Sequence, residues 1–166
     1  MWNKGIYVCG MMACLTAVSY LAQAAGTQSV SSDQIAATES ALRTEAERTH
    51  QPAVKQLQKS PGFYTSLIYR NSTGEVEIHT GFDEIVVVID GDATVQAGGK
   101  ASGVRTIAPG ELRGKSAQGA SPTSLKPNAV VTIPAGTPHQ VVVPDGGHVT
   151  YIDVKIEHRG TSAPSQ

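Results

Sequence analysis

Seven short stretches of alternating apolar and polar residues follow Gly62, and they constrain the fold of this chain more than any other feature. An alternation with a period of two is typical of β-strands that bury one face. Turn-forming residues, rich in Gly, Pro, Asn and Asp, separate the stretches. So many short strands predict an all-β barrel or sandwich. The predicted strands span residues 64–70, 75–79, 84–90, 94–97, 130–133, 139–143 and 149–157.

Length and composition agree with a single all-β unit. A chain of 166 residues with 40% hydrophobic content can bury one core and is short for two domains. Only 5% of the residues are aromatic, whereas 17 Gly and 9 Pro suit many turns. The formal net charge of -1 provides no basic surface and argues against a nucleic-acid partner.

Residues 1–24 have the layout of a signal peptide. Lys4 precedes an uncharged, mostly apolar run over 5–21, and Ala22-Gln23-Ala24 offers small residues for cleavage after Ala24. An uncleaved anchor is the alternative, and in both cases we expect an exported domain, periplasmic or extracellular. Both cysteines lie in this segment, so the mature domain would contain no disulfide, and no later segment is long and apolar enough to span a membrane.

The region 25–62 is predicted to form an N-terminal helical arm. Ser32 and Asp33 are good N-cap residues ahead of a helix over 34–50, whose thin apolar stripe suits the outside of a barrel or a dimer contact. A short second helical piece is expected around 53–58. The barrel domain is assigned to 63–159, with an irregular excursion over 101–128, and the tail 160–166 is expected to be disordered.

Candidate metal ligands stand where these strands should point their side chains inward. Glu77 and His79 share one face of a strand because they are two residues apart. Glu84 begins the next strand, and a tight turn delivers His139 at the head of a later one. Imidazole and carboxylate groups bind divalent transition metals and leave coordination positions open, so a metal site is predicted.

At these residues the chain resembles the cupin superfamily over about 64–157. The first cupin motif, Gly-x5-His-x-His-x3–4-Glu-x6-Gly, is matched by His79, Glu84 and Gly91, with Asn71 and Glu77 at the positions of the first Gly and the first His. The second, Gly-x5-Pro-x-Gly-x2-His-x3-Asn, is matched by Pro134, Gly136 and His139, with Asn128 and Val143 at the positions of the Gly and the Asn.

The resemblance implies a cupin-type jelly-roll β-barrel with a metal held by His79, Glu84 and His139. Because Glu77 stands where the family has a histidine, the site would comprise two His and two Glu, or two His and one Glu with Glu77 at the pocket rim. Iron, manganese, zinc and nickel all stay open. Loss of the metal, with both histidines simply hydrogen-bonded, is the alternative. A homodimer is expected from the resemblance.

The last predicted strand alternates Tyr151, Asp153 and Lys155 with three apolar residues. Such an amphipathic strand usually turns its polar face to water. Alternatively, Tyr151 and Lys155 face the barrel interior, where Lys155 could pair with a substrate carboxylate; Arg70 and Arg113 are further candidates for an anionic partner.

Three functions follow from these residues. An exported metalloenzyme of dioxygenase, isomerase or lyase type, acting on a small organic substrate that could be anionic, is favoured. A non-catalytic module that binds a small ligand is the main alternative. A storage role is the third, and the intact ligand spacing argues against it. The fold itself does not decide between them.

Overall fold

The computed structural model describes residues 26–158, and within them one helix precedes thirteen strands. Helix α1 spans Ser32–Thr49. The strands are β1 (Ala53–Ser60), β2 (Phe63–Arg70), β3 (Val76–His79), β4 (Phe82–Gly91), β5 (Ala93–Ala97), β6 (Lys100–Ser102), β7 (Arg105–Ala108), β8 (Glu111–Gly114), β9 (Ser116–Gln118), β10 (Ser121–Leu125), β11 (Val130–Ile133), β12 (His139–Val142) and β13 (Val149–Glu157).

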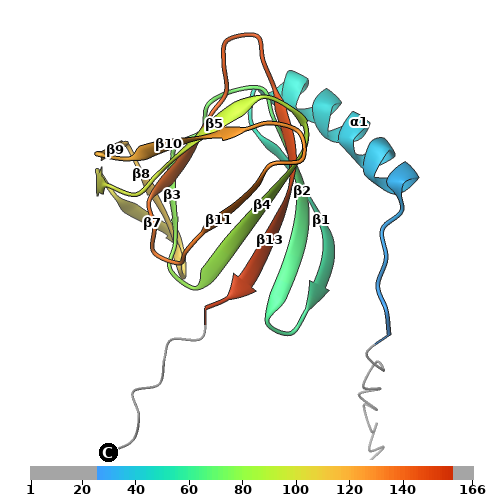
Figure 1. Cartoon of the computed structure of the whole chain (residues 1–166), viewed down its shortest axis with the longest axis horizontal. Helices are drawn as coiled ribbons and strands as arrows, with labels where there is room; N and C mark the ends of the chain where they lie inside the picture. Colours follow the sequence, from blue (N-terminus) through green and yellow to red (C-terminus); the bar gives the residue numbers. More distant parts are fainter. Residues whose placement is uncertain (1–25, 159–166) are drawn as a thin grey trace, which may run out of the picture.

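Two antiparallel sheets face each other and form the barrel (Figure 1). The first sheet has the order β1-β2-β13-β4-β11, and the second has the order β10-β5-β12-β3-β8-β7. Strands β6 and β9 form a separate two-stranded ribbon. Strands distant in the sequence therefore become neighbours, as in a jelly roll, and the predicted all-β, cupin-type barrel with an N-terminal helix is confirmed.

On β4 and β12, the inner face changes from polar to apolar along the strand. On β4, Glu84 precedes Val86 and Val88, and all three are buried. On β12, His139 precedes Val141 in the same way. The apolar ends join a cluster that closes one end of the barrel, and this burial of apolar area is the main stabilising contribution. The polar ends are thereby placed together at the other end.

Helix α1 covers the outer face of the first sheet (Figure 1). Ser31 caps the helix, accepting a hydrogen bond from the backbone of Gln34 while the Gln34 side chain bonds back to Ser31. Leu42 and Ala46 pack in a cluster with residues of β1 and β2, among them Leu67. The thin apolar stripe thus meets the outside of the barrel, one of its two expected positions.

The predicted second helical piece at 53–58 is wrong, because these residues lie in strand β1. Ala, Lys, Gln and Leu favour a helix in isolation, and Val54 and Leu57 have helical spacing. Antiparallel pairing with β2, from Ala53 opposite Tyr69 to Ser60 opposite Phe63, overrides this preference. The end of the predicted arm at residue 62 falls in the turn between these two strands.

The expected irregular excursion over 101–128 is also wrong, since it contains most of β6 and all of β7 to β10. These strands are short and largely exposed; β7, for example, is exposed throughout. They therefore lack the apolar alternation by which strands are recognised. Strand β8 pairs with β3 and brings two side chains to the functional site.

Two motif positions, Gly91 and Asn128, have positive φ angles, which restrict the side chains that fit there. Gly91 has φ +77°, and a Cβ there would come 2.2 Å from the backbone oxygen of His148. Asn128, at a family glycine position, has φ +70°, which asparagine adopts more readily than most residues. The substitution of Gly by Asn at 128 is thus compatible with the fold.

The signal peptide predicted at 1–24 and the tail predicted at 160–166 lie outside the described residues. Within 26–158, no helix has the length and apolar character needed to cross a membrane.

Candidate metal centre

Strand register brings the candidate site together from both sheets. In the second sheet, His139 of β12 lies opposite Glu77 of β3, and His79 lies opposite Glu111 of β8. In the first sheet, Glu84 of β4 lies opposite Lys155 of β13. Directly opposed residues project from the same face of a sheet, so these side chains all enter the barrel interior.

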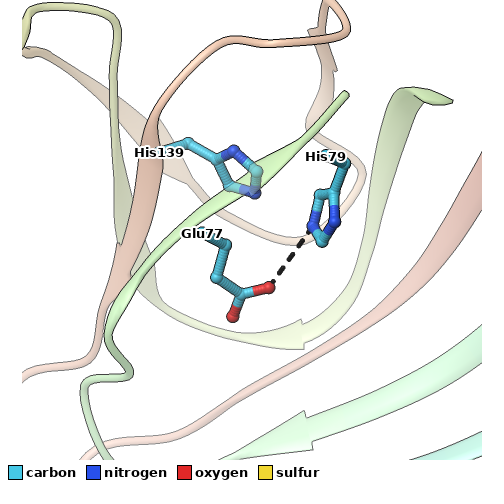
Figure 2. Close-up of side chains that lie close together, drawn as sticks. All are labelled: Glu77, His79 and His139. Atoms are coloured by element: carbon cyan, nitrogen blue, oxygen red, sulfur yellow. Dashed lines mark ion pairs between the residues drawn. The ribbon is translucent and has the colours of Figure 1, made fainter. Parts of the chain in front are cut away.

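Two imidazoles and a carboxylate converge at this place. Nε2 of His139 lies 3.3 Å from Oε2 of Glu84, and Nε2 of His79 lies 3.6 Å from the same oxygen. Glu77 Oε2 lies 3.4 Å from His79 Nε2, the contact dashed in Figure 2. Donor atoms of Glu77, His79 and His139 all lie within 4.8 Å of one another.

The other nitrogen of each imidazole is held by an acceptor. His139 Nδ1 donates to the carbonyl oxygen of Thr137 at 3.0 Å. His79 Nδ1 lies 2.7 Å from Glu111 Oε2. These acceptors favour the proton on Nδ1 of both rings and leave the Nε2 lone pairs directed to the shared site. Metal-binding histidines are oriented by such partners in many proteins.

These residues fit a divalent transition metal. Donor atoms bound to one ion at about 2.1 Å lie about 3.0–3.4 Å apart, close to the separations between Glu84 and the two histidines. Glu84 is 6% exposed, and its Oε2 has no hydrogen-bond partner among the described residues. A buried oxygen without a partner is costly, and a metal ion would satisfy it.

Electrostatics at Glu84 and His139 favour positive charge between them. Burial opposes ionisation of Glu84, but the close contact with His139 and the charge of that ring outweigh it, so the Glu84 pKa lies below its usual value. Burial likewise opposes protonation of His139, but the contact with Glu84 raises the pKa of His139. The carboxylate therefore stabilises a cation at this position, whether a proton on the ring or a metal ion.

Glu77 is held in an ionised form by arginines. Its Oε1 accepts a hydrogen bond from Arg70 Nη2 at 2.6 Å, and its Oε2 lies 3.6 Å from Arg113 Nη2. Burial opposes its ionisation, but His79 and these two guanidinium groups hold the Glu77 pKa well below the usual range. Since Oε2 also faces His79, both open readings of Glu77, a fourth ligand or a rim carboxylate, remain compatible with this arrangement.

Tyr151 and Lys155 face the barrel interior, so the usual expectation that the polar face of β13 meets water is wrong here. Tyr151 is 1% exposed and its Oη accepts a hydrogen bond from Arg70 Nε at 2.9 Å. Lys155 is 8% exposed, and its Nζ lies 3.1 Å from His79 Nε2. Tyr151 positions Arg70, whereas Lys155 lies directly beside the candidate ligands; a substrate-binding role of either residue stays a prediction.

Two acidic residues of the site were missed by the sequence reasoning. Glu111 belongs to β8, in the segment expected to be irregular, and no local pattern marks it. Asp153 lies between Tyr151 and Lys155 on the inner face of β13 and is 3% exposed. Burial, followed by the nearby charge of Glu84, raises the pKa of Asp153 to about 8.

A cavity of about 340 Å³ adjoins part of this site. Its wall includes Glu77, Glu84, Arg113, Asp153 and Lys155. The volume is at the lower end of the range for small-molecule pockets. A small polar compound could therefore reach Glu77 and Glu84 among the candidate ligands.

No protein-family model and no curated protein matches this chain. Solved structures resemble it at low identity. A Thermus thermophilus protein has 17% identity, a TM-score of 0.49 and coverage of 66% of this chain and 86% of its own. A cupin-like protein from Thermotoga maritima has 18% identity, a TM-score of 0.47 and coverage of 64% and 69%. The lyase DddQ from Ruegeria pomeroyi, which acts on DMSP, has 17% identity, a TM-score of 0.49 and coverage of 75% and 56%.

The strand order and the two facing sheets define this chain as a protein of the cupin fold. The candidate ligands of the two motifs lie on β3, β4 and β12. The fold leaves the reaction open.

Proposed function

We propose that this protein is a metal-dependent enzyme that acts on a small organic anion. The observation that carries the proposal is the convergence of His79 Nε2, His139 Nε2 and the unpartnered Oε2 of Glu84 in a buried place beside a cavity. We assign these three side chains as ligands of iron, manganese, zinc or nickel, with Glu77 as the candidate fourth.

When bound, such a metal would supply Lewis-acid polarisation of a substrate oxygen, or redox chemistry if it is iron or manganese. The protein residues would orient the metal ligands and exclude water. Glu111 and the Thr137 carbonyl orient the two imidazoles, and Arg70 holds Glu77 in place. The surrounding strands exclude bulk water, which strengthens every electrostatic interaction inside.

Two cations support an anionic substrate. Arg113 Nη1 donates to the carbonyl oxygen of Leu112 and lies 3.5 Å from Glu111 Oε2, and its Nη2 lies 3.6 Å from Glu77 Oε2. Lys155 lines the same cavity. A guanidinium group and an ammonium group both suit a carboxylate.

A ligand screen followed by a turnover assay separates an enzyme from a binding module. Metal-loaded and chelator-stripped protein would be screened by thermal shift against small organic acids, and each hit incubated and analysed by mass spectrometry. The proposal expects metal-dependent conversion of at least one hit. Binding without conversion, across all hits and all four metals, would favour the non-catalytic module instead.

The proposal includes export and pairing of two chains. Export is supported by the charged start, apolar run and small residues of 1–24. N-terminal sequencing of the protein from culture medium and periplasm tests it: a start at Ala25 supports it, and retention of Met1 inside the cell opposes it. Light scattering of the purified protein tests for the dimer.

A further inference from the structure

The ammonium group of Lys155 lies directly beside the imidazole ring of His79, a candidate metal ligand. Its Nζ is 3.1 Å from His79 Nε2 and 3.2 Å from His79 Nδ1. A metal bound to Nε2 would lie about 2.1 Å from that nitrogen. The metal and Nζ could therefore be no more than about 5.2 Å apart without movement of the lysine.

So short a separation is unfavourable in a buried place. Lys155 is 8% exposed, so little water screens its charge from that of a divalent ion. Because Nζ is almost equally far from Nε2 and Nδ1, it is off the axis of the Nε2 lone pair and does not occupy the position that a metal would take on that nitrogen. Lys155 therefore opposes the metal by its charge.

The Lys155 side chain has an alternative position near Glu111. Glu111 Oε1 lies 3.8 Å from its Nζ, while Glu111 Oε2 is the atom that contacts His79. The flexible lysine side chain can turn from the ring toward this oxygen and the adjoining cavity. There its ammonium group would meet an anion that enters the cavity.

We propose that Lys155 is a movable internal cation whose charge opposes metal binding at His79 and that, when displaced, binds a carboxylate group of the substrate. This inference rests on the proposed function and names small carboxylates as its substrate class. Metal and carboxylate then bind cooperatively. A bound metal displaces Lys155 toward the cavity, where it can bind the carboxylate, and a bound carboxylate holds Lys155 away from the metal.

Zinc titrations of the full chain test this without an activity assay. Zinc affinity would be measured against a competing chelator for the wild type, Lys155→Met and Lys155→Gln, in sodium chloride and in sodium acetate of equal ionic strength. Lys126→Met is the matched control, since Lys126 is an exposed lysine outside the cavity wall. Circular dichroism and thermal unfolding establish which variants fold; the glutamine variant serves if the methionine variant does not.

The proposal predicts at least tenfold tighter zinc binding by the neutral variants in chloride, with no change in Lys126→Met. Acetate should tighten zinc binding by the wild type and have a smaller effect on the Lys155 variants. Equal or weaker zinc binding by the variants would overturn the opposition of Lys155 to the metal, and an equal acetate effect in all proteins would overturn the carboxylate role. If neither the wild type nor the variants bind zinc, manganese, iron or nickel, the proposed function itself fails.

Discussion

Oε2 of Glu84 lies 3.3 Å from Nε2 of His139 and, within residues 26–158, has no hydrogen-bond partner. A ligand role explains both facts. Glu84→Gln keeps the shape of the side chain and removes its charge, so we expect metal affinity to fall at least tenfold while the fold is retained. Glu75→Gln is the matched control, since Glu75 is an exposed carboxylate paired with Arg105. Equal losses in both variants, measured by chelator competition, would contradict the assignment.

Glu111 should act on the metal through His79. Its Oε2 lies 2.7 Å from His79 Nδ1 and favours the ring orientation in which Nε2 faces Glu84. Removal of such a partner typically weakens metal binding about 10–100-fold. We therefore expect Glu111→Gln to lower zinc affinity within that range and to leave the stoichiometry at one ion per chain. Unchanged affinity would show that Glu111 does not orient His79.

The metal-free protein should lose stability as the pH rises toward 8. The pKa of Asp153 is raised to about 8 in the fold against an ordinary value of 3.8, so the folded state binds the extra proton between these values. The stability contributed by the protonated carboxyl is complete below about pH 4 and is lost as the pH rises through about 8.

Asp153→Asn keeps a neutral side chain at every pH. In the presence of a chelator, its free energy of unfolding should exceed that of the wild type at pH 9 by on the order of 1–3 kcal/mol, with a small difference at pH 4. Urea unfolding at both pH values measures this. A constant difference between the two proteins across the range would refute the buried proton on Asp153.

Helix α1 should stabilise the barrel without contributing to the metal centre. Leu42 is 5% exposed and packs against the outer face of the first sheet, away from the inward ligands. Leu42→Ala should destabilise the protein by about 2–4 kcal/mol and leave the metal stoichiometry unchanged. Urea unfolding measures the change in stability, and elemental analysis measures the metal stoichiometry. Loss of metal from folded Leu42→Ala would show that the helix contributes to the site.

Much of the barrel could be predicted from local alternation, and the candidate ligand set from alternation together with the resemblance to the two cupin motifs. Glu77 and His79 are two residues apart, which places them on one face wherever a strand forms. Glu111 could not be found in this way, since only the pairing of β8 with β3 brings it to His79. The same limit applies to β1, where helix-favouring residues form a strand through long-range pairing.

The inward face of β13 could not be chosen from its own sequence either. Alternation shows that Tyr151, Asp153 and Lys155 share a face, but the direction of that face depends on the neighbours. Arg70 accounts for the buried Tyr151 hydroxyl, and His79 and Glu111 surround the Lys155 ammonium. A polar interior of this kind is stable only as a network, and its members come from four different strands, β2, β3, β8 and β13.

Elemental analysis of the full chain, purified without chelators or affinity metals, tests the central claim most directly. The account predicts one iron, manganese, zinc or nickel ion per chain in the wild type and less than a tenth of that in His139→Ala. His50→Asn, the matched control, removes an exposed imidazole at a left-handed position that asparagine tolerates, and it should retain the full amount. A wild type without stoichiometric metal, or a His139→Ala protein that contains as much metal as the wild type, would contradict the account.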